Sequence, residues 1–428
     1  MKGRVEAIIG AQWGNEGKGR VIDALGDGFD IFARYQGGAN DGHTVIIDDK
    51  KLLFHLLPSG MLYHGKLCVI GGGVVIDPEL LLTEIKELQE KGMDRARLIV
   101  SRNAHIVMPY HKVLDKAQED IRGKGHKIEM ASKGMWPCYV DKHTRAGIRL
   151  EDIVNEHKLR SKLEWILEEK NMTLKRLYDK SPIAFDEVFN LACQWGRELS
   201  PYLADTSLEI NDAVNNGKNV LIEGAQGTLL DIDNGTYPYV TSSSPVSAGA
   251  CLGLGIAPNN IDRVLVVVKS YSTRAGEGPM PTEDDGEIGN YLRDKGGEYD
   301  VAAGRPRRCG WIDIVALNYA LRINGAQSII LTKLDVLTGL DKIKFCTAYE
   351  VEDNIYHNFI SEADFLSEVK PIYEEVPGWT ENISECRKFD ELPKAAQGFL
   401  RIIEERCKTP ILLVGVGPQR HQLIDMGL

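Results

Sequence analysis

The feature that most constrains the fold is a glycine-rich loop that follows an apolar run at residues 5–9. Residues 10–20 read Gly-Ala-Gln-Trp-Gly-Asn-Glu-Gly-Lys-Gly-Arg, and a helical pattern follows at 21–25. The glycines leave backbone N–H groups free to approach an anion, and Lys18 adds a positive charge beside them. A strand, such a loop and a helix form the usual cradle for a phosphate. Since Gly19, and not Ser or Thr, follows Lys18, the spacing is not that of a standard P-loop, and a glycine-rich turn with an exposed lysine is the alternative.

Short apolar runs alternate with helical stretches along the whole chain. Several runs are unbroken, as in strands covered on both faces, and many end where α/β proteins place ligand loops. The predicted strands are 5–9, 31–35, 67–70, 97–100, 219–222, 263–268, 328–331 and 410–414, with a small hairpin at 44–47 and 52–56. We expect an α/β fold with a large, mostly parallel central sheet flanked by helices, with a P-loop-like phosphate-binding loop and with helical and small β insertions. Residues 1–428 are expected to form one elaborated domain, with a helical subdomain at about 150–215.

The bulk composition argues against several classes of function. The 428 residues carry a net charge of −11, which disfavours broad nucleic-acid binding. The sequence has no signal-peptide core and no run of about eighteen apolar residues, so we expect a cytoplasmic protein without a membrane span. None of the eight cysteines forms a Cys-x-x-Cys pair, which argues against a zinc site or a disulfide framework.

Two further clusters combine glycines with polar side chains after predicted strands. Residues 36–44 read Gln-Gly-Gly-Ala-Asn-Asp-Gly-His-Thr, where His43 is a candidate general acid or phosphate donor, with a structural histidine as the alternative. Residues 223–227 read Glu-Gly-Ala-Gln-Gly, and a Thr-Ser-Ser-Ser run follows at 241–244. Gln226 offers a donor and an acceptor, which suits the edge of a heterocycle. The hydroxyl run suits a phosphate, unless it only hydrogen-bonds to itself.

Two clusters nearer the C-terminus carry basic residues. Residues 304–311 place three arginines in four positions, which suits bidentate binding of carboxylate or phosphate, with a solvated basic turn as the alternative. Residues 332–335 read Thr-Lys-Leu-Asp after a predicted strand. Asp335 can accept from the N1–H and 2-amino groups of guanine while the stem of Lys333 packs on the ring. This resembles the base-reading motif of GTP-binding proteins, although Lys-x-Asp alone is a common pattern.

Taken in this order, the five clusters resemble adenylosuccinate synthetase, and the resemblance covers essentially the whole chain. Further matching segments are 137–142, 228–239, 273–279 and 417–420. Enzymes of this family use GTP and Mg²⁺ to join L-aspartate to C6 of IMP, and they work as homodimers with shared active sites. The resemblance implies that GTP phosphorylates the purine C6 oxygen, which turns it into a good leaving group that the aspartate amine displaces.

The resemblance implies roles for individual residues in catalysis and GTP binding. Lys18 and His43 stabilise the charge that builds on the γ-phosphoryl group, with His43 acting as an acid toward the leaving phosphate, and Gln226 touches the purine O6. The Gly42 carbonyl ligates Mg²⁺, and Asn15 stands at the position of another ligand. The residues implied in GTP binding are Gly14, Glu16, Gly17, Lys18, Gly19, Lys333, Asp335, Gly417 and Pro418.

Other positions are implied in binding the acceptor and the amino acid. Asn40 and Thr241 hold the 5′-phosphate of the nucleotide. Arg305 and Arg307 grip the carboxylates of aspartate. Arg145 reaches the nucleotide phosphate bound to the partner subunit of the homodimer.

The chain departs from the family pattern around the acceptor sites. Asn15 replaces the aspartate that removes the purine N1 proton and helps to bind Mg²⁺. An amide oxygen can still ligate magnesium, but it cannot serve as the general base, whose help is typically worth about 10²–10⁴-fold. Asp41 adds a carboxylate where the family usually has Ala, and it is a candidate replacement base or an acceptor for an exocyclic amine. Further replacements are Met130 and Ala131 for a Thr pair that binds the nucleotide phosphate, Ala302 and Ala303 for a second Thr pair in the aspartate loop, and Trp136 for a glycine.

These departures leave three hypotheses. The family default is IMP, with Asp41 as surrogate base. The first alternative is GMP or dGMP, which gives 2-aminoadenylosuccinate: phage-encoded relatives that lack the aspartate use dGMP, and the Asn15 carbonyl can accept from the 2-amino group. The second alternative is a GTP-binding paralogue without ligase activity. Because the replacements surround the acceptor sites while the GTP-reading motif is kept, we favour an active enzyme with altered acceptor specificity over an inactive paralogue, with strict use of aspartate left open.

Overall fold

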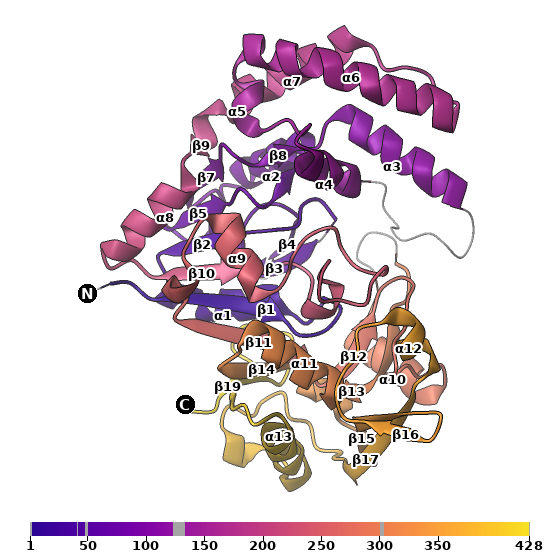
Figure 1. Cartoon of the computed structure of the whole chain (residues 1–428). Coiled ribbons are helices and arrows are strands. Elements are labelled where there is room, and N and C mark those ends of the chain that lie inside the picture. Colours follow the sequence, from indigo (N-terminus) through magenta and orange to yellow (C-terminus); the bar gives the residue numbers. More distant parts are fainter. Residues whose placement is uncertain (1, 41, 48–49, 123–132, 300–303, 428) are drawn as a thin grey trace.

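A ten-stranded, mostly parallel sheet forms the centre of the computed structural model, which describes residues 2–40, 42–47, 50–122, 133–299 and 304–427 (Figure 1). In spatial order the strands are β19 (Leu423–Asp425), β18 (Ile411–Gly415), β14 (Ser328–Thr332), β11 (Arg263–Lys269), β1 (Val5–Gly10), β10 (Val220–Glu223), β2 (Ile31–Arg34), β5 (Leu67–Ile70), β7 (Arg97–Ser101) and β9 (Leu203–Ala204). Neighbours pair in parallel except β18 and β19, which are antiparallel. The expected fold class is confirmed, and all eight predicted strands of this sheet lie within one residue of their predicted bounds.

The centre of the sheet is covered on both faces, which explains why its inner strands are mostly apolar. Along β11, Val264, Val266 and Val268 belong to one hydrophobic core, whereas Leu265 and Val267 belong to another. Successive side chains of a strand point to opposite faces, so both sets must be apolar. Helices α8 (Thr206–Asn215), α9 (Ser247–Leu254), α11 (Ile314–Asn324) and α13 (Lys394–Cys407) contribute to the first core, and α1 (Lys18–Leu25) and α2 (Pro78–Glu90) to the second.

A group of helices extends beyond one end of the sheet. It contains α3 (Pro109–Arg122), α4 (Met135–Thr144), α5 (Leu150–Ile153), α6 (Glu156–Tyr178) and α7 (Phe185–Leu199), seen at the top of Figure 1. The range 150–215 consists of the helices α5 to α8, joined by short connections, a 3₁₀ turn and the short strand β9. No helix in the described part of the chain is both long and apolar enough to cross a bilayer.

A second, smaller sheet lies on the other side of the molecule; small β insertions are expected from the sequence, but the strands of this sheet are not among the predicted strands. It contains β12 (Tyr271–Arg274), β13 (Arg308–Asp313), β15 (Lys342–Val351), β16 (Asn354–Tyr356) and β17 (Lys370–Pro377), with α10 (Glu287–Gly296) and α12 (Ala363–Glu368) nearby (Figure 1). The predicted hairpin is confirmed as β3 (His43–Ile47) and β4 (Lys50–Phe54), which pair antiparallel. Short elements complete the fold: β6 (Val75–Ile76), β8 (His105–Ile106) and the 3₁₀ turns Gly26–Gly28, Ser59–Leu62, Ser200–Tyr202, Thr228–Leu230, Pro258–Asn260, Leu334–Leu337 and Phe389–Glu391.

Candidate active site

The glycine loop joins the carboxyl end of β1 to the start of α1, as the sequence predicts. Gly14, Asn15 and Gly17 all have positive φ, at 84°, 61° and 87°. Gly17 is the N-cap of α1 and has no side chain to cap it, so its open helix end is a natural place for an anion. Asn15 is exposed at the surface of the loop, in a left-handed conformation that asparagine tolerates better than most residues.

A buried carboxylate occupies the inner side of this loop. Glu16 is fully buried, and its Oε1 accepts hydrogen bonds from the backbone N–H groups of Gln12 and Gly14, at 3.0 and 2.9 Å. Its Oε2 lies 2.7 Å from Nζ of Lys18, which also donates to the backbone oxygen of Gln226. Two of the groups expected to bind phosphate, Nζ of Lys18 and the N–H of Gly14, are therefore engaged by Glu16 in this structure, and a phosphate would compete for them.

The loop also contacts the Thr-Lys-Leu-Asp segment. Thr332, the last residue of β14, donates from Oγ1 to the backbone oxygen of Glu16 at 2.6 Å. Lys333 follows in a left-handed conformation with φ 60°, and Asp335 lies in the next 3₁₀ turn. Burial raises the pKa of Asp335, an effect that the charges of Arg20, Lys333 and Lys295 partly oppose. The predicted guanine-reading segment thus begins beside the predicted phosphate loop.

The Gly417–Pro418 loop reaches the same region, because β18 is the neighbour of β14 in the sheet. Gly417 is buried, and a Cβ at this position would lie 2.3 Å from Oε1 of Gln422. The backbone oxygen of Gln422 accepts from Arg20 of helix α1 at 2.7 Å. Burial lowers the pKa of Arg20 to about 10, against the opposing charge of Asp335. The structure therefore brings together the residues expected to bind GTP from three separate segments: the glycine loop, residues 332–335 and residues 417–418.

The predicted acceptor residues gather on the other side of the glycine loop. Gln226 has φ 60°, and its Nε2 donates to Oγ1 of Thr241 at 3.1 Å. Oγ of Ser243 lies 3.1 Å from Oε1 of Gln36 and 3.4 Å from Oε1 of Gln226. Asn40 follows in the same segment as Gln36, and its Oδ1 is buried with no hydrogen-bond partner among the described residues. Gln36, Gln226, Thr241 and Ser243 thus form one hydrogen-bonded cluster, and the buried Oδ1 of Asn40 is a separate acceptor or metal-facing oxygen that a ligand could satisfy.

The region around His43 is described only in part. His43 begins β3, but its side chain lies outside the described residues, as do Asp41, Ala131 and Ala303. Gly42 is exposed, and the ring of His55 packs against it, since a Cβ at Gly42 would lie 3.1 Å from Nε2 of His55.

The sequence analysis missed His55 and the carboxylate that holds it. Nδ1 of His55 lies 3.1 Å from Oε1 of Glu84, and the Glu84 carboxylate also accepts from the backbone N–H groups of His55, Leu56 and Leu57. Burial alone would raise the pKa of Glu84, but these hydrogen bonds outweigh it and keep the pKa below its ordinary value. The sequence contains no local pattern that links Glu84 of α2 with His55.

The arginine cluster lies at the start of β13. Arg305 is exposed, and Nη1 of Arg307 lies 2.8 Å from Oε2 of Glu298, a fully buried carboxylate that the sequence analysis also missed. Arg308 forms an ion pair with Glu283 through Nε and Nη2. The three arginines therefore differ in their surroundings: Arg305 is exposed, Arg307 binds the buried Glu298, and Arg308 binds Glu283.

Arg145 lies at the C-terminal end of α4, where it is exposed with φ 66°. The two residues after it, Ala146 and Gly147, donate their N–H groups to the backbone oxygen of Asp141, both at 2.9 Å. The carboxylate of Asp141 in turn binds the buried ring of His111 at 2.9 Å. This network fixes the turn that presents Arg145 to solvent.

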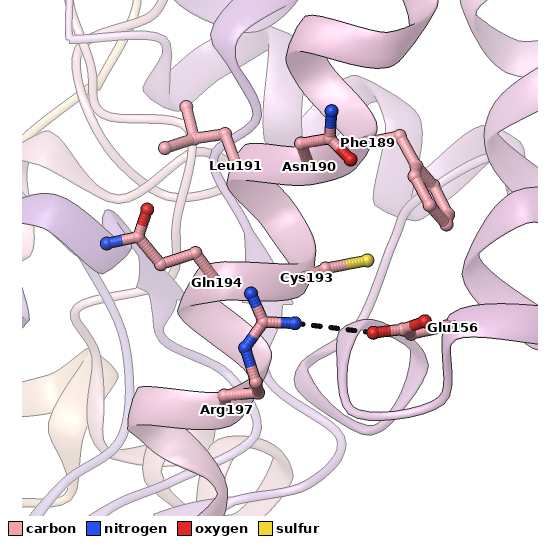
Figure 2. A pocket seen from close by; sticks show the side chains of 7 residues that line it. All are labelled: Glu156, Phe189, Asn190, Leu191, Cys193, Gln194 and Arg197. Carbon is pink, nitrogen blue, oxygen red and sulfur yellow. Dashed lines mark hydrogen bonds and ion pairs between the residues drawn. The ribbon is translucent and has the colours of Figure 1, made fainter.

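A groove between α6 and α7 contains none of the predicted site residues (Figure 2). It has a volume of about 470 Å³ and is lined by Glu156, Phe189, Asn190, Leu191, Cys193, Gln194 and Arg197. Glu156 and Arg197 face each other across it at 3.3 Å, and both side chains are mostly exposed. The groove therefore belongs to the helical surface and not to the site around the glycine loop.

Comparison with known proteins gives one consistent family. The sequence profile of adenylosuccinate synthetase matches residues 7–424. Adenylosuccinate synthetase of Pelotomaculum thermopropionicum is 49% identical over 417 residues, which cover 97% of each chain. The enzyme of Thermobifida fusca is 48% identical over 422 residues, which cover 98% of each chain.

Two solved structures resemble the fold to different degrees. Fully ligated adenylosuccinate synthetase from Plasmodium falciparum has a TM-score of 0.92 and 41% identity, with 99% of this chain and 100% of that chain covered. Succinoaminodeoxyadenylate synthetase of cyanophage S-2L, bound to dGMP and to dATP as an energy donor, has a TM-score of 0.63 and 18% identity, with 100% and 97% covered. The second likeness extends to the fold alone.

Proposed function

The chain belongs to the adenylosuccinate synthetase family, and from this premise we propose how its own residues carry out the reaction. As a member it is a carbon–nitrogen ligase that uses GTP and joins L-aspartate to C6 of a 6-oxopurine nucleotide. We propose IMP as the acceptor. Relatives that are 46–49% identical over nearly the whole chain support this choice, whereas the relative bound to dGMP is only 18% identical.

One observation carries the proposal: the glycine loop contacts both predicted nucleotide sites. Lys18 donates to the backbone of Gln226, on the side of the acceptor, and Thr332 donates to the backbone of Glu16, on the side of the GTP base. Transfer of the γ-phosphoryl group to the purine oxygen requires the donor phosphate between the guanine and the acceptor. The glycine loop contacts residues of both predicted sites, and this supports its assignment as the binding loop for the donor phosphate.

The chemistry that we assign to these residues is electrostatic. Lys18 and the loop N–H groups bind the phosphates of GTP when they exchange Glu16 for phosphate oxygens. His43 protonates the leaving phosphate, and Gln226 binds the purine O6. These groups stabilise the charge that develops on the γ-phosphoryl oxygens, a contribution that is typically worth about 10²–10³-fold for one donor. Asn15 cannot accept the N1 proton, so we assign this role to Asp41.

We propose that the aspartate carboxylates bind Arg305 and Arg307. Arg307 is held by Glu298, which leaves its remaining N–H groups for a carboxylate in the bidentate geometry that guanidinium favours. The acceptor phosphate binds Asn40 and Thr241. Arg145 contributes from the partner subunit of a homodimer, which its exposed, fixed turn supports. A cytoplasmic location stays a prediction.

The donor set near the loop fits Mg²⁺. Magnesium prefers oxygen ligands and binds largely through water and substrate phosphates. Asn15 offers an amide oxygen and Gly42 a backbone oxygen, both on exposed residues. Because both are neutral, the phosphates must supply the negative charge. When bound, the ion would neutralise charge on the phosphoryl group during transfer.

The decisive experiment measures phosphate release from GTP with Mg²⁺ and L-aspartate, with IMP, GMP and dGMP in parallel. We expect turnover with IMP to exceed that with either guanine nucleotide. Faster turnover with GMP or dGMP would show that the preferred acceptor is a guanine nucleotide and not IMP. GTP binding without phosphate release in any reaction would refute the ligase assignment.

A further inference from the structure

Glu298, which follows the end of α10, connects two parts of the proposed site. Its side chain is fully buried, and its carboxylate accepts from four side chains. Oε1 binds Nζ of Lys333 at 2.9 Å, Nζ of Lys269 at 3.2 Å and Oη of Tyr271 at 2.6 Å. Oε2 binds Nη1 of Arg307 at 2.8 Å. One carboxylate thus joins a residue proposed to bind guanine to a residue proposed to bind aspartate.

The backbone strengthens the link between Glu298 and Arg307. The N–H of Arg307 donates to the backbone oxygen of Glu298 at 2.9 Å, and Tyr299 and Pro306 form an antiparallel bridge beside them. Arg293 of α10 donates from Nε to the backbone oxygen of Arg307 at 2.8 Å. Arg307 therefore moves together with Glu298.

The cations around Glu298 require the negative charge of its carboxylate. It faces three cations, and Lys269 is fully buried while Arg307 is 13% exposed and Lys333 30% exposed at the side chain. Burial opposes ionisation of Glu298, but the charges of Lys269 and Lys333 and the hydrogen bond from Tyr271 keep its pKa well below the ordinary value. A buried charge is costly unless it is paired, so the fully buried ammonium of Lys269 depends most strongly on this carboxylate.

We propose that Glu298 is a positioning residue that couples occupancy of the guanine site, sensed through Lys333, to the placement of Arg307 for aspartate. The inference rests on the proposed function, from which it takes the roles of Lys333 and Arg307. Lys333 also donates to the backbone oxygen of Gly296, close to Glu298 in the chain, so a base that fixes Lys333 fixes the carboxylate from two directions. A ligand changes the affinity of a second site only if it interacts differently with the two states of the protein, and the contacts of Lys333 provide a route for such a difference.

The test measures the affinity for L-aspartate by calorimetry, with IMP present and GDP either absent or saturating. Coupling between two sites is typically at least about fivefold, and we expect GDP to tighten aspartate binding by at least that factor in the wild-type chain. Glu298→Gln keeps the shape of the side chain but removes the charge. In this variant we expect the effect of GDP to disappear and the KM values for GTP and aspartate to rise together, while the KM for IMP stays unchanged.

The matched control is Glu283→Gln, which breaks the ion pair of the neighbouring Arg308 and leaves Glu298 intact. We expect it to retain the wild-type effect of GDP. Because Glu298→Gln leaves the Lys269 charge buried without a carboxylate, the double variant Glu298→Gln/Lys269→Met provides a charge-balanced version. It too should lose the coupling.

The outcomes separate this inference from the proposed function. If the wild-type chain turns over IMP but GDP leaves aspartate affinity unchanged, or if either Glu298 variant keeps the effect, the coupling role is wrong and the reaction stands. If the wild-type chain binds no aspartate with IMP and GDP present, the proposed function fails, and the inference fails with it.

Discussion

The carboxylate of Glu16 lies 2.7 Å from the ammonium of Lys18, and both groups are buried within the glycine loop. The loop therefore contains its own anion at the place where a phosphate is expected. The internal pair keeps the Lys18 charge compensated until a nucleotide arrives, which avoids the cost of a buried, unpaired ammonium. On the role proposed for Lys18, binding of GTP exchanges one anionic partner of this side chain for another.

We predict that Lys18→Met lowers kcat by about 10²–10³-fold, because the variant removes a donor aimed at the developing phosphoryl charge. Steady-state phosphate release with GTP, IMP and aspartate measures the effect. Lys86→Met is the matched control, since Lys86 is 75% exposed on α2 and pairs only with Glu90 in the same helix. The role assigned to Lys18 is wrong if the two variants have similar kcat values.

The central sheet was predictable because its strands are unbroken apolar runs. The inner strands of this sheet are buried on both faces, so most of their positions must be hydrophobic, and polar or glycine residues mark the ends. Small β insertions were expected, but the individual strands of the second sheet escaped prediction for the opposite reason. Strand β13 begins with Arg308 and contains Gly310, so its residues read as a basic loop. Strand β17 is half exposed and carries Glu374 and Glu375 side by side.

The candidate site was predictable where chemistry resides in short motifs, and not where it depends on distant partners. The glycine loop and the segment that contains Lys333 were recognisable because glycines and charges follow apolar strands. Glu298 and Glu84 were not, because each is a single glutamate whose partners come from other elements. Burial of a carboxylate among donors is a tertiary property, which local spacing does not reveal.

We predict that Gly417→Ala raises the KM for GTP severalfold and leaves the KM for IMP unchanged. The added Cβ would lie 2.3 Å from Oε1 of Gln422, whose side chain accepts from the N–H of Gln419 and whose backbone oxygen accepts from Arg20. Displacement of Gln422 therefore disturbs the end of the site nearest the proposed guanine pocket. Gly398→Ala is the control, because no atom lies within 4 Å of a Cβ at this position in α13. Equal KM values for GTP in the two variants would contradict the proposal that the Gly417–Pro418 loop lies at the guanine site.

We predict that Asp313 makes the protein less stable as the pH rises from about 4 to about 6. Burial raises the pKa of Asp313 from 3.8 to about 6, although Tyr349 and the N–H of Ala316 hydrogen-bond to it. The folded state thus binds more protons than the unfolded state in this window, and linkage makes stability fall as the pH increases. The contribution present below the unfolded pKa and lost above the folded pKa is about 3 kcal/mol.

The measurement for Asp313 is the free energy of unfolding in urea at pH 4 and pH 7. Asp313→Asn should be less sensitive to this change than the wild-type chain, because the amide does not titrate. Comparison of the two chains cancels the titration of all other groups. An identical pH dependence in both would show that Asp313 has an ordinary pKa.

The last prediction concerns the replacement of the family's catalytic aspartate by Asn15. If Asp41 supplies the missing base, Asp41→Asn lowers kcat with IMP by about 10²–10⁴-fold, the usual value of general-base help. The double variant Asn15→Asp/Asp41→Asn should recover activity, because it returns a carboxylate to the family's position while keeping Asp41 removed. The single variant Asn15→Asp has carboxylates at both positions, and its kcat shows whether the second carboxylate raises or lowers activity. Full activity in Asp41→Asn would exclude Asp41 as the base, and failure of the double variant to recover would show that Asp41 does more than accept the proton.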